Sequence, residues 1–197
     1  MGAINSAIAL VKNPLGYMTS DKDSPATVNS IMINYVAVLA AVPFFATLIG
    51  DLWYYSLFGS FAGYLIGYAF LAAVLTYIFD LISVYVIAIV IQTLSGNFGS
   101  TNDRIRSLKL SAWVFTPAFL ISVLNIIPFL GVLTILGILY GLYILYLGVP
   151  IVLGTPKEKV VPYVVAIVVA TFVVYLVIGV IIGFATAAVF ASTFRFL

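Results

Sequence analysis

Asp80 is the residue whose type and position could most directly do chemistry, because it is an acid inside a long apolar run. The run from Phe61 to Leu94 contains no Lys, Arg or His to pair with it. An ionisable residue inside a membrane span is by default a candidate functional site. Tyr77 and Ser83 lie three positions away, so a helix brings them to the same face as Asp80. We consider a proton or cation site, a neutral acid that joins helices by hydrogen bonds, or an acid that reaches water because the long helix is displaced.

Other chemistry has little support in the sequence. The absence of Cys and His excludes disulfides, iron–sulfur clusters and most zinc or copper sites. Neither a phosphate-binding loop nor a Gly-x-Ser-x-Gly elbow occurs. Asp21 and Asp23 flank Lys22 in a polar stretch, which indicates a solvated turn rather than a metal site. We therefore predict no catalytic residue, no cofactor and no enzyme activity.

Glycines recur at a spacing of four, which places them on one helical face and lets another helix approach closely. Two such sets are candidate packing faces: Gly59, Gly63 and Gly67 in one, and Gly137 and Gly141 in the other. Gly179 and Gly183 repeat the spacing near the C-terminus. Packing within the monomer and the seam of an oligomer are both compatible with this pattern.

Composition predicts the elements that position these residues. The chain of 197 residues is 64% hydrophobic and only 7% charged, whereas soluble domains carry roughly a quarter charged residues. A membrane span needs about 20 mostly apolar residues. We predict an all-α, polytopic transmembrane helical bundle with five spans, at Ser30–Gly50, Phe61–Leu94, Leu110–Ile127, Val132–Leu153 and Val160–Phe190.

An N-terminal segment, residues 1–29, precedes the transmembrane domain, residues 30–197. Ile4, Ile8 and Val11 recur at helical spacing, which predicts a short helix lying in the membrane interface. Asn13-Pro14 should end this helix. Residues 19–29 are polar and are predicted to form a loop.

The cations predict the orientation. With five spans, one side of the membrane collects seven cations, and the other side has only Arg195; the seven are Lys12, Lys22, Arg104, Arg106, Lys109, Lys157 and Lys159. The positive-inside rule then predicts a cytoplasmic N-terminus and an external C-terminus. Five of the cations are candidate contacts to lipid headgroups or a cytoplasmic partner: Arg104, Arg106, Lys109, Lys157 and Lys159. The alternative is that they only anchor the topology. The net charge of +2 does not indicate nucleic-acid binding.

Residues 98–163 carry a recognisable series of motifs. It includes Phe98-Gly99, Ser107–Leu110, Thr116-Pro117, Ile127–Gly131, Leu139–Pro150, Thr155–Lys159 and Pro162-Tyr163. The series resembles the prokaryotic branch of the Yip family, which is named for proteins that interact with Ypt/Rab GTPases. The resemblance implies five spans and a cytoplasmic N-terminus. It implies no catalytic residues, and the long N-terminal region of eukaryotic members has no counterpart here, so GTPase binding is not expected.

Two functions follow as hypotheses for a multi-pass membrane protein, which a prokaryotic cell would hold in its cell membrane. The first is a non-enzymatic scaffold that binds membrane lipids, another membrane protein or a second copy of itself. The second is a small transporter or channel in which Asp80 serves as an intramembrane proton or cation site.

Overall fold

The computed structural model describes residues 2–57 and 62–194, and in this part the chain is mostly helical, with short loops and no strand. Five helical stretches in this part are long and apolar enough to cross a membrane, in agreement with the predicted fold class. The elements in chain order are α1 (Ala3–Lys12), α2 (Pro14–Asp21), α3 (Val28–Ile31), the π-helical turn η1 (Met32–Val36), α4 (Ala37–Tyr55), α5 (Ala62–Ser95), the 3₁₀ turn η3 (Gly96–Phe98), α6 (Arg104–Ile121), the 3₁₀ segments η4 (Ser122–Ile126) and η5 (Pro128–Leu133), α7 (Thr134–Leu153) and α8 (Lys157–Phe194).

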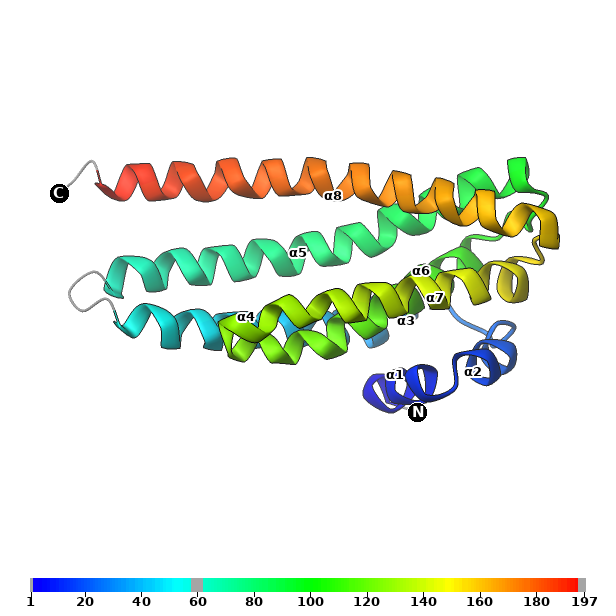
Figure 1. Ribbon diagram of the computed structural model, residues 1–197, viewed down its shortest axis with the longest axis horizontal. Helices are drawn as coiled ribbons and strands as arrows, with labels where there is room; N and C mark the ends of the chain where they lie inside the picture. Colours follow the sequence, from blue (N-terminus) through cyan, green and yellow to red (C-terminus); the bar gives the residue numbers. More distant parts are fainter. Residues whose placement is uncertain (1, 58–61, 195–197) are drawn as a thin grey trace.

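The long helices form an elongated bundle (Figure 1). α3, η1 and α4 make one continuous first span, Val28–Tyr55. α6 and α7 form a hairpin, and its turn ends before the far ends of α5 and α8 (Figure 1). α8 packs mainly along α5. The short helices α1 and α2 lie beside one end of the bundle only (Figure 1).

The packed core lies toward that same end of the bundle. One cluster of buried residues joins α2 to the spans and includes Met18, Ile91, Leu145 and Tyr163. A second cluster joins α1 to α4, α5 and α6. α8 is mostly open, since only 11% of the residues in its most apolar stretch are buried inside the protein. In a membrane, lipid covers such a surface at no desolvation cost.

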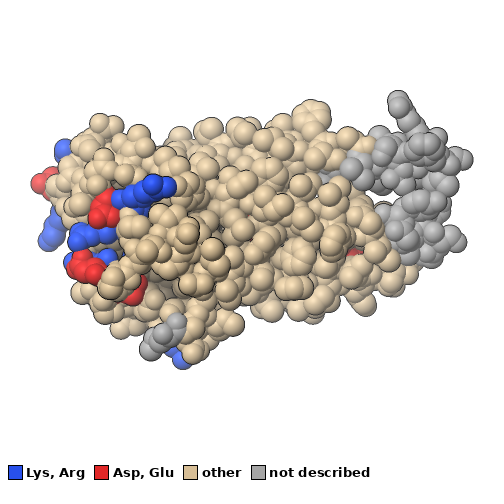
Figure 2. All heavy atoms as spheres, turned by 180° about the vertical axis from the view of Figure 1, so that it is seen from behind, with Lys and Arg blue, Asp and Glu red and all other residues tan. Residues whose placement is uncertain are grey.

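Three loops meet at this end of the bundle, which we call the charged end. They are residues 22–27 of the N-terminal segment, residues 99–103 and residues 154–156. The Thr101 amide donates to the Leu153 carbonyl at 2.8 Å, and the hydroxyls of Ser100 and Thr155 are 2.7 Å apart. Gly154 ends α7 with a φ of 67°, a backbone conformation that glycine adopts without strain. Lys, Arg, Asp and Glu gather at one end of the face shown in Figure 2, and the rest of that face is almost free of them.

Several predicted boundaries differ from the structure. The third span begins at Arg104 rather than Leu110, because the Asp103 carboxylate caps the helix by accepting from the Arg106 amide at 2.9 Å. The predicted loop of residues 19–29 is wrong at both ends, since α2 runs to Asp21 and α3 begins at Val28. Asn13 ends α1 as predicted, and its side chain also starts α2 by accepting from the Gly16 amide.

Candidate functional site

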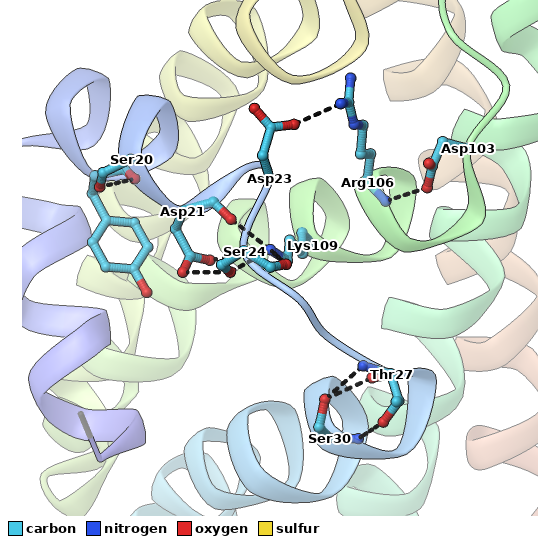
Figure 3. A network of polar contacts seen from close by, with 10 residues as sticks. Ser20, Asp21, Asp23, Ser24, Thr27, Ser30, Asp103, Arg106 and Lys109 are labelled. Carbon is cyan, nitrogen blue, oxygen red and sulfur yellow. Dashed lines mark hydrogen bonds and ion pairs between the residues drawn. The ribbon is translucent and has the colours of Figure 1, made fainter.

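Lys109 is the centre of a polar network at the charged end (Figure 3). Its ammonium group donates to the Asp21 carbonyl, to the Ser24 carbonyl at 2.9 Å and to the Ser24 hydroxyl at 2.7 Å. The Asp21 carboxylate lies 3.5 Å away, and only 4% of the Lys109 side chain is exposed. An ammonium group has three N–H donors, and here all three are used. The expectation that Lys109 faces headgroups or a partner is therefore wrong, because folding directs it inward onto the N-terminal segment.

Arg106 adds a second, more exposed connection to the same segment. Its guanidinium lies 2.6 Å from the Asp23 carboxylate, and the two side chains are 34% and 61% exposed. A second nitrogen reaches the Val152 carbonyl at 3.5 Å. Exposed ion pairs contribute only about 0.2–1 kcal/mol. Arg106 therefore stabilises the attachment of the N-terminal segment to α6 less than Lys109 does. Arg106 has internal partners, but part of its side chain stays accessible.

Three predicted contact residues are exposed at the charged end: Arg104, Lys157 and Lys159. Arg104 donates to the Tyr85 hydroxyl and lies over its ring, 5.7 Å from the centroid. Lys157 and Lys159 begin α8 together with Glu158, whose charge suits a helix N-terminus. The charged end thus has two kinds of cation, those that hold the fold and those that face outward.

The polar network fastens a hairpin of α1 and α2 to the bundle. The Tyr140 hydroxyl donates to the Val11 carbonyl at 2.8 Å, and the rings of Tyr17 and Trp113 meet edge to face at 5.8 Å. Met18 is fully buried beside Gly148, where an added Cβ would lie 3.2 Å from its sulfur. Burial raises the pKa of the Tyr17 phenol, which keeps this group neutral. The hairpin is therefore part of the core, not a loose tail.

Asp80 lies on α5 facing α8. Tyr175 of α8 is its electrostatic neighbour. The Ser83 hydroxyl donates to the Phe79 carbonyl at 2.6 Å. Tyr77 belongs elsewhere, since its hydroxyl donates to the Ala37 carbonyl at 3.2 Å. Asp80 and Tyr175 thus lie near each other where α5 packs against α8, and Ser83 follows Asp80 by three residues on α5. Among the described residues no salt bridge to Asp80 occurs, and none of them form a metal-binding group of three or more acids.

The candidate glycines fall into different surroundings. A Cβ at Gly137 would lie 2.8 Å from the Ala118 Cα, and one at Gly141 would lie 2.4 Å from the Val114 carbonyl oxygen. These two glycines let α6 and α7 approach each other within the monomer. A Cβ at Gly67 would meet nothing within 4 Å. Gly59 lies outside the described residues, and Gly63 is in α5 with surroundings that are not described.

A comparison with protein families identifies the family of this chain. The model of the Yip1 domain matches residues 8–181, which includes α2, the first four spans, most of the fifth span and the charged end. The chain belongs to the Yip1 family. Comparison with curated proteins and with solved structures finds no match. In this Yip1 family member, two of the motif residues hold the charged end together: Phe98 stacks on Tyr163 at 4.6 Å, and the Tyr163 hydroxyl donates to the Ile91 carbonyl.

Sequence reasoning missed two sets of partners. The sequence predicts a solvated turn around Asp21 and a loop that contains Ser24, although both residues accept hydrogen bonds from Lys109, which is 85 or more positions away. Tyr175 was not singled out, although it is the one tyrosine in the apolar stretch from Val164 to Phe194. That isolation was a usable signal, because a lone polar group in a span has to find a partner within the bundle.

Proposed function

We propose that this chain is a non-enzymatic membrane scaffold whose charged end faces the cytoplasm and binds anionic lipid headgroups or a membrane-protein partner. The observation that carries the proposal is the exposure of Arg104, Lys157 and Lys159 at the end where the core is packed. The buried Lys109 connects the elements of that end to one another, so the exposed cations belong to a packed part of the protein.

The energetics favour lipid as the first partner. A basic residue next to an anionic membrane surface contributes about 1 kcal/mol. Lys157 and Lys159 are fully available, since neither has a salt-bridge partner among the described residues. Together they would give an enrichment of anionic lipid of roughly 30-fold if both energies applied in full.

The test is lipid enrichment around the purified protein in nanodiscs of mixed phosphatidylcholine and phosphatidylglycerol, read by native mass spectrometry. The double variant Lys157→Gln/Lys159→Gln should lose most of the bound phosphatidylglycerol, whereas Lys157→Arg/Lys159→Arg should keep it because its charge is unchanged. Equal enrichment in the two variants would rule out headgroup binding by these lysines. Chemical cross-linking in the native membrane then decides whether the same surface holds a protein, either a second copy or a different chain.

One observation favours a second candidate, a small transporter or channel. Asp80 of α5 lies near Tyr175 of α8, and an intramembrane acid between two spans could pass a proton or bind a cation. Proton or cation flux in liposomes should then fall for Asp80→Asn, which keeps the shape of the side chain. Tyr77→Phe serves as the control, because the Tyr77 hydroxyl bonds to Ala37 instead. Equal flux in wild type and Asp80→Asn, or none in either, would remove this candidate.

A further inference from the structure

The two ends of the bundle differ in the number of helices that they contain. At the charged end α1 and α2 lie beside the spans, in contact with α6 and α7 (Figure 1). At the other end the α6–α7 hairpin turns back first, and α4, α5 and α8 continue past it (Figure 1). The hairpin turn is level with Gly50, where an added Cβ would lie 2.2 Å from the Asn125 carbonyl oxygen, and α4 runs on from there to Tyr55. The protein is therefore wider at the charged end than at the opposite end.

The α1–α2 hairpin, which adds this width, has an apolar outer surface. Ile4, Ile8 and Leu15 are 54%, 42% and 55% exposed, and none of them is needed to dock the hairpin, which uses Ala7, Leu10, Pro14 and Met18. Lys12 is exposed between the two helices. Apolar side chains with a flanking cation beside a set of membrane spans fit the headgroup and upper acyl region of one lipid leaflet. Helices of this type bury their apolar face about 5–10 Å into that region.

The hairpin is also fixed to the spans. Lys109 holds the residues after α2, and Tyr140 holds the end of α1. A freely hinged amphipathic helix could leave the leaflet without moving the protein. This one cannot, because its buried side belongs to the same core as the spans.

We infer that the α1–α2 hairpin is a wedge in the leaflet at the charged end and concentrates the protein in membranes that are convex on that side. A rigid insertion that widens one leaflet fits best where that leaflet is already expanded, and interfacial helices respond to curvature for this reason. The inference goes beyond the proposed function and rests on apolar surface and shape. It does not depend on the outward lysines, so either can fail alone.

The test measures protein density on single vesicles of mixed diameter made of phosphatidylcholine and phosphatidylglycerol. The chain has no cysteine, so a Lys157→Cys background labelled after reconstitution with an impermeant dye reports only molecules whose charged end faces outward. We expect the ratio of protein to lipid signal to rise several-fold from the largest to the smallest vesicles. Molecules oriented inward, labelled after permeabilisation, should show the opposite trend.

Two variants separate the wedge from other causes. Ile4→Ser/Ile8→Ser/Leu15→Ser removes the exposed apolar face and should flatten the dependence on diameter, whereas Ile4→Leu/Ile8→Leu/Leu15→Ile should keep it. Equal slopes in these two variants would overturn the inference. The inference would also be overturned if the ratio of protein to lipid signal for the wild-type hairpin did not depend on vesicle diameter, whether or not the serine variant folds.

Discussion

The buried Lys109 allows a prediction with a magnitude. Lys109→Met keeps the apolar stem but removes three charge-assisted hydrogen bonds to Asp21 and Ser24. Such bonds contribute about 1.5–3 kcal/mol each. The released groups recover part of this by hydration, because the Asp21 side chain is already 35% exposed. We therefore expect the free energy of hairpin opening to fall by about 2–4 kcal/mol, which is less than the sum of three bonds.

Hydrogen–deuterium exchange in nanodiscs measures this quantity directly. At 1.4 kcal/mol per factor of ten, amides of residues 3–21 should exchange roughly 30 to 1,000 times faster in Lys109→Met. Amides of α6 and α7 should change little, which shows that the bundle remains folded. Arg106→Met should accelerate exchange only a few-fold, because its ion pair is exposed.

The matched control is Lys159→Met, the same substitution at an exposed lysine. It should leave exchange in residues 3–21 at the wild-type rate. If Lys109→Met and Lys159→Met gave the same protection of α1 and α2, the attachment of the hairpin through Lys109 would be refuted.

Three further predictions concern packing. Gly141→Ala should destabilise the bundle by about 1–3 kcal/mol, because the added methyl meets the Val114 carbonyl. Gly67→Ala, in open surroundings, should be neutral or slightly stabilising. Unfolding in mixed micelles compares the stability of the two variants, and equal losses would contradict the α6–α7 contact. Tyr140→Phe should weaken hairpin docking by about 0.5–1.5 kcal/mol through the lost bond to Val11, and Tyr143→Phe, 49% exposed, should not; exchange rates in α1 distinguish the two. Gly154→Ala should lower the thermal midpoint by an amount equivalent to about 1 kcal/mol, because φ is 67° there; an unchanged midpoint would show that the α7–α8 turn tolerates another conformation.

Much of the fold could be predicted because the bilayer imposes simple rules on sequence. Runs of about 20 apolar residues give the spans, and all five were placed. Local signals also worked where one residue type decides the outcome, as at Asn13-Pro14. Boundaries failed where a cap decides them, as at Asp103, since an N-cap Asp looks like any other loop acid.

The site was harder to predict because its partners are far apart in sequence. Lys109 and Ser24 are separated by 85 positions, and nothing local distinguishes a lysine that turns inward from Lys157, which stays outside. Both follow the positive-inside pattern equally well. For Asp80 the helical spacing selected both Ser83 and Tyr77, although the Tyr77 hydroxyl bonds to the neighbouring span instead. Spacing fixes a face of a helix, not the neighbour that the face meets.

The charged end is most directly tested by cysteine labelling of intact cells, since the chain has no cysteine of its own. Single-cysteine variants Lys157→Cys and Ser56→Cys place a thiol at opposite ends of the bundle, both at exposed positions. With an impermeant reagent, Ser56→Cys should be labelled from outside, and Lys157→Cys should react only after the membrane is permeabilised. Labelling of Lys157→Cys in sealed cells, with Ser56→Cys protected, would contradict the cytoplasmic orientation of the charged end that the proposed function requires.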